Sequence, residues 1–216
     1  MKSSSIGRKL VMSISGMFLI MFLTLHLAIN FTAIISREAY ERASHFMSEN
    51  IFIKMMVPVL ALGFIVHIAM GVILTIQNRK ARPTDYTVKG KHPKVSWASK
   101  NMFALGIIIL GLLIIHLNHF WAEIQLQEFL GNAKANPYDL VVATFSNWWN
   151  VSVYVIWILA IGFHVSHGFW SMFQSMGLNN DKWLPRLRTI AIIYSYVITT
   201  GYIIIPIYFF LGFGQA

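Results

Sequence analysis

The chain contains no cysteine among its 216 residues and carries little charge. Without cysteine there is no disulfide, no iron–sulfur ligation, no thiolate nucleophile and no covalent haem attachment through Cys-x-x-Cys-His. Charged residues make up 12% of the chain, about half the share that is typical of a soluble domain. Because 56% of the residues are hydrophobic, this composition excludes an ordinary soluble domain and indicates a membrane protein.

Acidic residues number only eight, and none of them falls in five long apolar segments. Each segment is long enough to cross a bilayer as a helix, which takes about 20 apolar residues. The predicted spans cover residues 10–36, 55–78, 101–122, 150–176 and 189–213. We therefore predict an all-α membrane protein, with residues 1–216 forming a single transmembrane domain of five helices. A proton path through buried carboxylates is not expected, since no Asp or Glu lies inside a span.

The placement of Lys and Arg predicts the orientation of the chain in the membrane. Four of the 17 basic residues fall on the side opposite the N-terminus, and the other thirteen fall on the same side as the N-terminus. These thirteen are Lys2, Arg8, Lys9, Arg79, Lys80, Arg82, Lys89, Lys91, Lys94, Lys100, Lys182, Arg186 and Arg188. The N-terminus is therefore predicted to be cytoplasmic and the C-terminus to lie outside. Basic residues spread along the rims of a bundle fit membrane lipid or an acidic partner better than they fit nucleic acid. The basic segment 79–100 is a candidate docking site for a cytoplasmic partner.

Two connections on the outer side are expected to contain short helices. The first is the polar segment 37–54. The second is the sequence YDLVVATFSNWWN, residues 138–150. It is typical of a helix at the membrane interface, with Trp148 and Trp149 at the level of the lipid headgroups.

Six of the eight histidines lie in or at the ends of the predicted spans. They are His26, His67, His116, His119, His164 and His167. A single histidine inside a membrane most often makes an interhelical hydrogen bond, but ionisable residues in spans are rare and tend to be functional. Histidines on each of the first four spans form the pattern that two b haems require, each held by two neutral imidazoles from facing helices. We therefore predict that a bundle of the first four spans holds two haems.

Depth along the spans predicts which histidines form pairs. His26 and His116 lie 17 and 16 residues from the inner ends of their spans, whereas His67 and His164 lie 12 and 13 residues from theirs. At a rise of 1.5 Å per residue, the first two lie roughly 5–7 Å further out. His26 and His116 are therefore the predicted ligands of an outer haem iron. His67 and His164 are the predicted ligands of an inner one.

On two helices a second histidine could be the ligand instead. His119 follows His116 by three residues and His167 follows His164 by three residues, so each shares a helix face with the predicted ligand. Internal repeats favour His116 and His164. LTLHLAINF is echoed by LIIHLNHFW, and HIAMGVILTIQ is echoed by HVSHGFWSMFQ. His119 and His167 are then candidates to contact a haem propionate or a quinone.

The second repeat also contains a glycine four residues after each histidine, at Gly71 and Gly168. A missing side chain at these positions would admit a porphyrin. Close helix packing through small residues is the alternative explanation.

Four stretches together resemble a known family: GRKLVMSISGMFLIMFLTLHLAIN, HIAMGVILTIQNRKARP, SWASKNM and GFHVSHGFWSMFQSMGL. They are similar to the single-subunit dihaem cytochrome b anchor of succinate dehydrogenase and fumarate reductase (respiratory complex II), in the five-helix form of Bacteroidetes-type bacteria. The resemblance runs over essentially the whole chain. Carried onto this sequence, the haem ligands of the family fall on His26, His67, His116 and His164.

The resemblance implies a membrane-anchor and electron-transfer subunit of succinate:quinone oxidoreductase in the bacterial cytoplasmic (inner) membrane. A flavoprotein subunit on the cytoplasmic side would oxidise succinate with FAD, as in the tricarboxylic acid cycle, and an iron–sulfur subunit would connect it to this chain. The two b haems would exchange electrons with menaquinone, and the chain would contain no catalytic residue for succinate. Some fumarate reductases of the family have a Glu two residues before the fourth-span ligand for proton movement, whereas this chain has Gly162.

Two other functions remain open from the sequence. One is the dihaem cytochrome b subunit of another quinone-linked dehydrogenase, such as hydrogenase or formate dehydrogenase, whose partners usually lie outside. The other is a haem-free transporter or proton channel with a chain of histidines. Transporters tend to have inverted repeats and broken helices, whereas the repeats here relate spans that run in the same direction.

Overall fold

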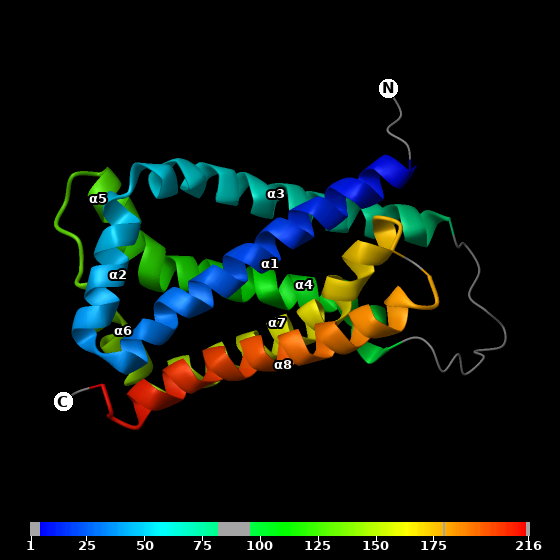
Figure 1. The fold of residues 1–216 in the computed structure, drawn as a ribbon. Helices are drawn as coiled ribbons and strands as arrows, with labels where there is room; N and C mark the ends of the chain where they lie inside the picture. The colour runs from blue at the N-terminus through cyan, green and yellow to red at the C-terminus, as the bar shows by residue number, and fades with distance from the viewer. Residues whose placement is uncertain (1–4, 82–95, 179, 215–216) are drawn as a thin grey trace.

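The computed structural model describes residues 5–81, 96–178 and 180–214, and within these ranges the chain forms helices and no strand (Figure 1). The long helices are α1 (Ser5–Ile35), α3 (Ile51–Lys80), α4 (Trp97–His116), α7 (Trp148–Ser175) and α8 (Trp183–Phe210). The shorter ones are α2 (Arg37–Glu49), the π-helix η1 (Leu117–Leu126), α5 (Gln127–Phe129) and α6 (Pro137–Phe145). Because η1 and α5 continue α4 without a break, the chain forms five long helical rods.

All five rods are long and apolar enough to cross a membrane, which confirms the predicted number of spans. The structure is that of a multi-pass membrane protein. Each rod begins a few residues before its predicted apolar segment. Polar residues at the start of a helix also make its backbone hydrogen bonds, so the helix is longer than the apolar segment. The third span was predicted to end at residue 122, but its rod continues to Phe129. The last span was predicted to reach residue 213, but α8 ends at Phe210, before Gly212 with a φ of 84°.

The helix ends separate into two groups at opposite ends of the bundle (Figure 1). One end has the start of α1, the end of α3, the end of α7 and the starts of α4 and α8. The other end has the short helices α2, α5 and α6 together with the end of α8. We refer to these as the inner and outer ends, following the predicted orientation. The basic segment proposed as a docking site falls mostly at residues 82–95, which lie outside the described residues.

The two short helices predicted on the outer side are present as α2 and α6. Ser36 caps α2, accepting a hydrogen bond from the backbone N–H of Ala39, and Asn136 caps α6 in the same way. Arg37 on α2 joins the two helices, since its guanidinium pairs with Asp139 on α6 at 2.9 Å. The second helix is shorter than predicted, since α6 ends at Phe145, and Trp148 and Trp149 begin α7 instead, where both are exposed. Their position at the level of the headgroups stays a prediction.

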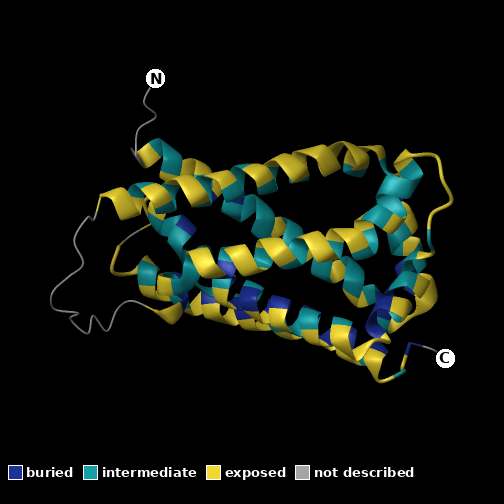
Figure 2. Ribbon diagram, turned by 180° about the vertical axis from the view of Figure 1, so that it is seen from behind, coloured by how far each residue is buried: buried dark blue, intermediate teal, exposed yellow. Residues whose placement is uncertain are grey.

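Burial is uneven among the five rods (Figure 2). Most of the fully buried positions fall on α6, α7 and α8, whereas none of the residues of α3 is fully buried. Helices α7 and α8 pack closely at Gly162. There the hydroxyl of Ser195 donates to the carbonyl of Gly162 at 2.6 Å, and a Cβ at Gly162 would clash with Oγ1 of Thr199. Side chains of α8 therefore lie directly on the backbone of α7, as small residues permit in membrane proteins.

Candidate haem-binding sites

Four helices surround the interior of the bundle in the order α1, α3, α4, α7. Helix α1 packs against α3 and α7, and α4 packs against α7 and more lightly against α3. Helices α1 and α4 are therefore diagonal neighbours, and so are α3 and α7. Helix α8 packs outside this ring, against α7 and α1. Any group that joins a diagonal pair must reach across the interior.

The outer diagonal is crossed by two imidazole rings. The ring of His26 on α1 lies 5.8 Å from the ring of His116 on α4, measured between centroids, and their planes are at 89°. Aromatic side chains surround the pair. Phe22 stacks on His26 at 5.2 Å, and Trp157 lies 5.1 Å from His116. The hydroxyl of Tyr202, whose ring is 6.2 Å from His26, donates to the carbonyl of Leu23, so that ring is fixed in place.

The inner diagonal is crossed in the same way. The ring of His67 on α3 lies 6.3 Å from the ring of His164 on α7, with the planes at 66°. An iron bound by two imidazole nitrogens at about 2 Å each would hold the ring centroids about 6 Å apart. Both centroid distances are compatible with one metal ion between the rings, and they also fit an ordinary edge-to-face contact of two rings. The two pairs that meet in space are the two that depth along the spans predicts.

Ser15 on α1 orients the ring of His67. The hydroxyl of Ser15 donates to the carbonyl of Met12 at 3.0 Å, and its oxygen lies 3.3 Å from Nδ1 of His67. Both contacts are hydrogen bonds when Nδ1–H of His67 is the donor. In that tautomer the lone pair is on Nε2, and an imidazole that donates through its other nitrogen is the usual arrangement in a metal ligand.

The other three rings have weaker support from the protein. Nδ1 of His26 lies 3.4 Å from the amide nitrogen of Asn30, whose shorter hydrogen bond, 2.8 Å, goes to the carbonyl of His26. Nδ1 of His116 and Nδ1 of His164 are buried and have no hydrogen-bond partner among the described residues. All four histidines retain some accessible surface as residues, although they lie between helices. Paired imidazoles whose buried nitrogens lack a protein partner fit a prosthetic group better than they fit a closely packed core.

Two glycines beside the inner pair were not predicted from the sequence. A Cβ at Gly16 on α1 would lie 3.4 Å from Cε1 of His67, and a Cβ at Gly106 on α4 would lie 3.9 Å from Cε1 of His164. The available signal was their spacing, since each lies ten residues before a paired histidine of its own helix. A Cβ at either position would make an ordinary van der Waals contact with the ring, so only a larger side chain would displace it.

The glycines that the sequence did single out lie elsewhere. The nearest atom to a Cβ at Gly71 would be Cε of Met12 at 3.8 Å, and nothing lies within 4 Å of one at Gly168. Space at Gly168 is compatible with the predicted role of admitting a porphyrin. That role stays a prediction for both glycines.

His119 and His167, the competing histidines, have other neighbours. Nδ1 of His119 is 3.2 Å from the hydroxyl of Tyr154, and the two rings stack at 12°. The ring of His167 packs edge-on against Trp170 with centroids 4.9 Å apart. Neither ring is opposed by a histidine of the diagonal helix, in contrast to His116 and His164.

The π-helix η1 begins directly after His116 and was not predicted. A π-helix is rare, and it often occurs at functional sites, because its wider turn changes the direction of the side chains that follow. His119 lies within η1 and is turned against Tyr154 on α7.

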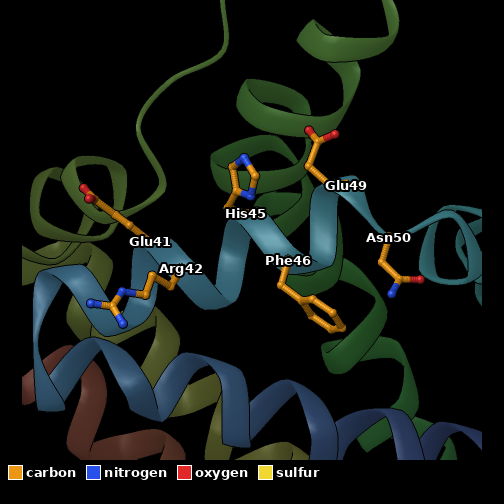
Figure 3. Close-up of a pocket in the computed structure, with 6 residues that line it drawn as sticks. All are labelled: Glu41, Arg42, His45, Phe46, Glu49 and Asn50. Carbon is orange, nitrogen blue, oxygen red and sulfur yellow. The ribbon is translucent and has the colours of Figure 1, made fainter.

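The open pocket on α2 is separate from these pairs (Figure 3). It is lined by Glu41, Arg42, His45, Phe46, Glu49 and Asn50. In Figure 3 the side chains of His45 and Glu49 point to one side of the helix and that of Phe46 to the other. In the part of the chain that the structure describes, no group of three or more His, Asp or Glu side chains is arranged to hold a metal ion. This absence applies to metal sites with three or more protein ligands, such as zinc sites. It does not apply to a bis-histidine haem, which takes only two ligands from the protein.

The glycines beside the inner pair allow a direct test of the site. Gly106→Leu is expected to reduce the haem content of the purified chain from two per chain to about one, because the new side chain extends towards the ring of His164. Gly111→Leu on the same helix is the control, since nothing lies within 4 Å of its position. Haem is counted against protein by absorbance of the pyridine complex. Two haems in the Gly106→Leu protein would show that this glycine does not border a haem.

Comparisons of the chain with protein-family models, with curated proteins and with solved structures find no match.

Proposed function

We propose that this chain is a dihaem cytochrome b, in which His26 and His116 hold an outer haem and His67 and His164 hold an inner one. The observation that carries the proposal is the pair of imidazole contacts across the two diagonals of the bundle. One histidine contact could be structural. Two of them, at different depths, with ring planes at 89° and 66° and a centroid spacing that would accommodate an iron in each, support a ligand set for two haems in series.

When bound, haem b supplies a one-electron carrier, and the residues of the chain determine where it is held and how it is tuned. Ser15 can accept a hydrogen bond from Nδ1–H of His67, which leaves Nε2 of that ring as the ligand atom. Phe22, Phe120 and Trp157 surround the outer pair with aromatic rings. Apolar surroundings and hydrogen bonds to a ligand are both means by which a protein sets a reduction potential.

The partners follow from the resemblance and from charge. We propose that the chain is the membrane anchor of a succinate:quinone oxidoreductase (succinate dehydrogenase or fumarate reductase) in a bacterial inner membrane. It would exchange electrons between an iron–sulfur subunit and menaquinone, with the flavoprotein subunit bound beyond it. The excess of Lys and Arg on the inner side supports a cytoplasmic position for these subunits.

The test is an optical difference spectrum recorded in two steps. Purified chain, reduced with dithionite, is expected to give a b-type spectrum with two haems per chain. Membranes that contain the chain and its soluble partners are expected to show reduction of the same haems on addition of succinate. Folded chain without any haem would overturn the proposal. If two haems are present and are reduced by hydrogen or formate but not by succinate, the dihaem assignment holds. The partner would then be a hydrogenase or a formate dehydrogenase.

A further inference from the structure

A cationic cluster lies at the inner end of α7 and α8 and has no role in holding iron. It consists of His167 and Trp170 on α7 and Arg188 on α8. The guanidinium carbon of Arg188 lies 4.6 Å from the centroid of the Trp170 ring, and the opposing ring of His167 lies 4.9 Å from that centroid. Trp170 therefore holds both side chains in place, one by a cation–π contact and one edge-on.

Two buried nitrogen atoms of this cluster lack hydrogen-bond partners among the described residues. Nδ1 of His167 and Nε of Arg188 are both buried, and neither has a hydrogen-bond partner among the described residues. An unpaired guanidinium N–H inside a membrane protein is costly, since Arg in a span normally pairs or reaches water. The cluster therefore has the chemistry of an anion site, with a fixed guanidinium and an imidazole supplying the donors.

The position of the cluster near His164 indicates which anion it would bind. His167 follows the predicted ligand His164 by one turn, and Trp170 follows it by two turns towards the inner end of α7. A b haem has an apolar macrocycle with two carboxylates at one edge, and a carboxylate in hydrocarbon must be paired with a cation. We propose that Arg188, with His167, binds a propionate carboxylate of the inner haem. This inference rests on the proposed function.

Arg186 shows why a lipid phosphate is the weaker choice. It lies two residues from Arg188 on the same helix, is exposed, and stacks on Trp183 at 5.4 Å, as expected of a residue at the level of the headgroups. Arg188 is half-buried, and its Nε is sealed from solvent. Arg186 is therefore also the matched control, because it has the same charge on the same turn of α8 without the buried donor.

The experiment compares Arg188→Gln with Arg186→Gln, each loaded with haem b or with its dimethyl ester, which has no carboxylate. A His116→Ala background leaves only the inner haem. Two quantities are measured: the rate at which the haem transfers to an excess of a soluble apo-haem protein, and the midpoint potential of the haem. With haem b, Arg188→Gln is expected to accelerate transfer about tenfold and to lower the potential, because a charge-assisted hydrogen bond is lost. Arg186→Gln is expected to match the unsubstituted protein.

The ester distinguishes the source of the anion. If Arg188 binds a propionate, the unsubstituted protein loses the ester as fast as Arg188→Gln loses haem b, and Arg188→Gln has no further effect. An equal effect of Arg188→Gln with both haems, or one that depends on anionic lipid, would overturn the proposal. Identical behaviour of the two Gln variants would overturn it as well.

If Arg188→Gln fails to fold, Arg188→Lys is used, which keeps the charge and loses the fixed fork of donors. Absence of haem from the unsubstituted chain would instead refute the proposed function, so the two failures are distinguishable.

Discussion

Replacing His164 by alanine is expected to reduce the haem content from two per chain to one, whereas replacing His167 by alanine is expected to leave both haems bound. The reason is geometric. The ring of His164 faces that of His67 at 6.3 Å across the bundle, whereas the ring of His167 packs on Trp170 of its own helix. Loss of one of the two axial ligands removes the haem from a bis-histidine site. Haem per chain, from the reduced minus oxidised spectrum, is the measurement.

The same comparison can be made on the third span. His116→Ala is expected to remove the outer haem, and His119→Ala is expected to retain it, since His119 is engaged by Tyr154 at 3.2 Å. A double variant of His26 and His164, one ligand from each pair, is expected to bind no haem. Loss of a haem in His119→Ala or His167→Ala, together with retention in His116→Ala or His164→Ala, would show that the ligands are the other two histidines.

The pairing of histidines was predictable because it depends on one number, the rise of a helix per residue. Equal depth identified His26 with His116 and His67 with His164 without knowledge of any contact. The internal repeat gives a second reason. Spans that repeat each other, α1 with α4 and α3 with α7, are diagonal in the bundle. The internal repeat therefore relates each histidine to its partner on the diagonal helix.

The same repeat relates the two glycines that the sequence did not reveal. Gly16 on α1 faces His67 on α3, and Gly106 on α4 faces His164 on α7. Each glycine lies ten residues before the paired histidine of its own helix. Sequence patterns report the face and depth of a residue in its own helix, but a glycine is explained by what lies opposite to it, on another helix. Ser15, which holds Nδ1 of His67 from α1, could not be identified for the same reason.

Helix boundaries were the least predictable part of the fold. The apolar pattern located the centre of each span but not its ends, because polar residues continue a helix beyond the hydrocarbon. Glu123 thus follows the predicted third span and yet lies within the helical rod. The π-helix after His116 was not predictable, since the length and apolar composition of its segment do not distinguish it from α-helix.

Gly162→Ala is expected to lower the free energy of unfolding by about 1–3 kcal/mol, the usual cost of overpacking. The new Cβ would lie 2.3 Å from Oγ1 of Thr199, and the carbonyl of Gly162 accepts a hydrogen bond from Ser195, so α7 cannot withdraw from α8 without breaking it. Unfolding of the detergent-solubilised chain, followed by circular dichroism, measures the effect. Gly111→Ala, with open space around it, is expected to be neutral or slightly stabilising.

Thr199→Ala is the compensating change, because it removes the hydroxyl and the methyl group that a Cβ at position 162 would meet. The double variant is expected to recover most of the lost stability, and additive losses would show that Thr199 is not the cause. Gly162→Glu is expected to be far more damaging, since it adds a long side chain and an unpaired carboxylate in a buried contact. Some fumarate reductases of the family that the chain resembles have a glutamate at the corresponding position for proton movement. Here the contact between α7 and α8 occupies that space, so a proton route through position 162 would require the two helices to separate.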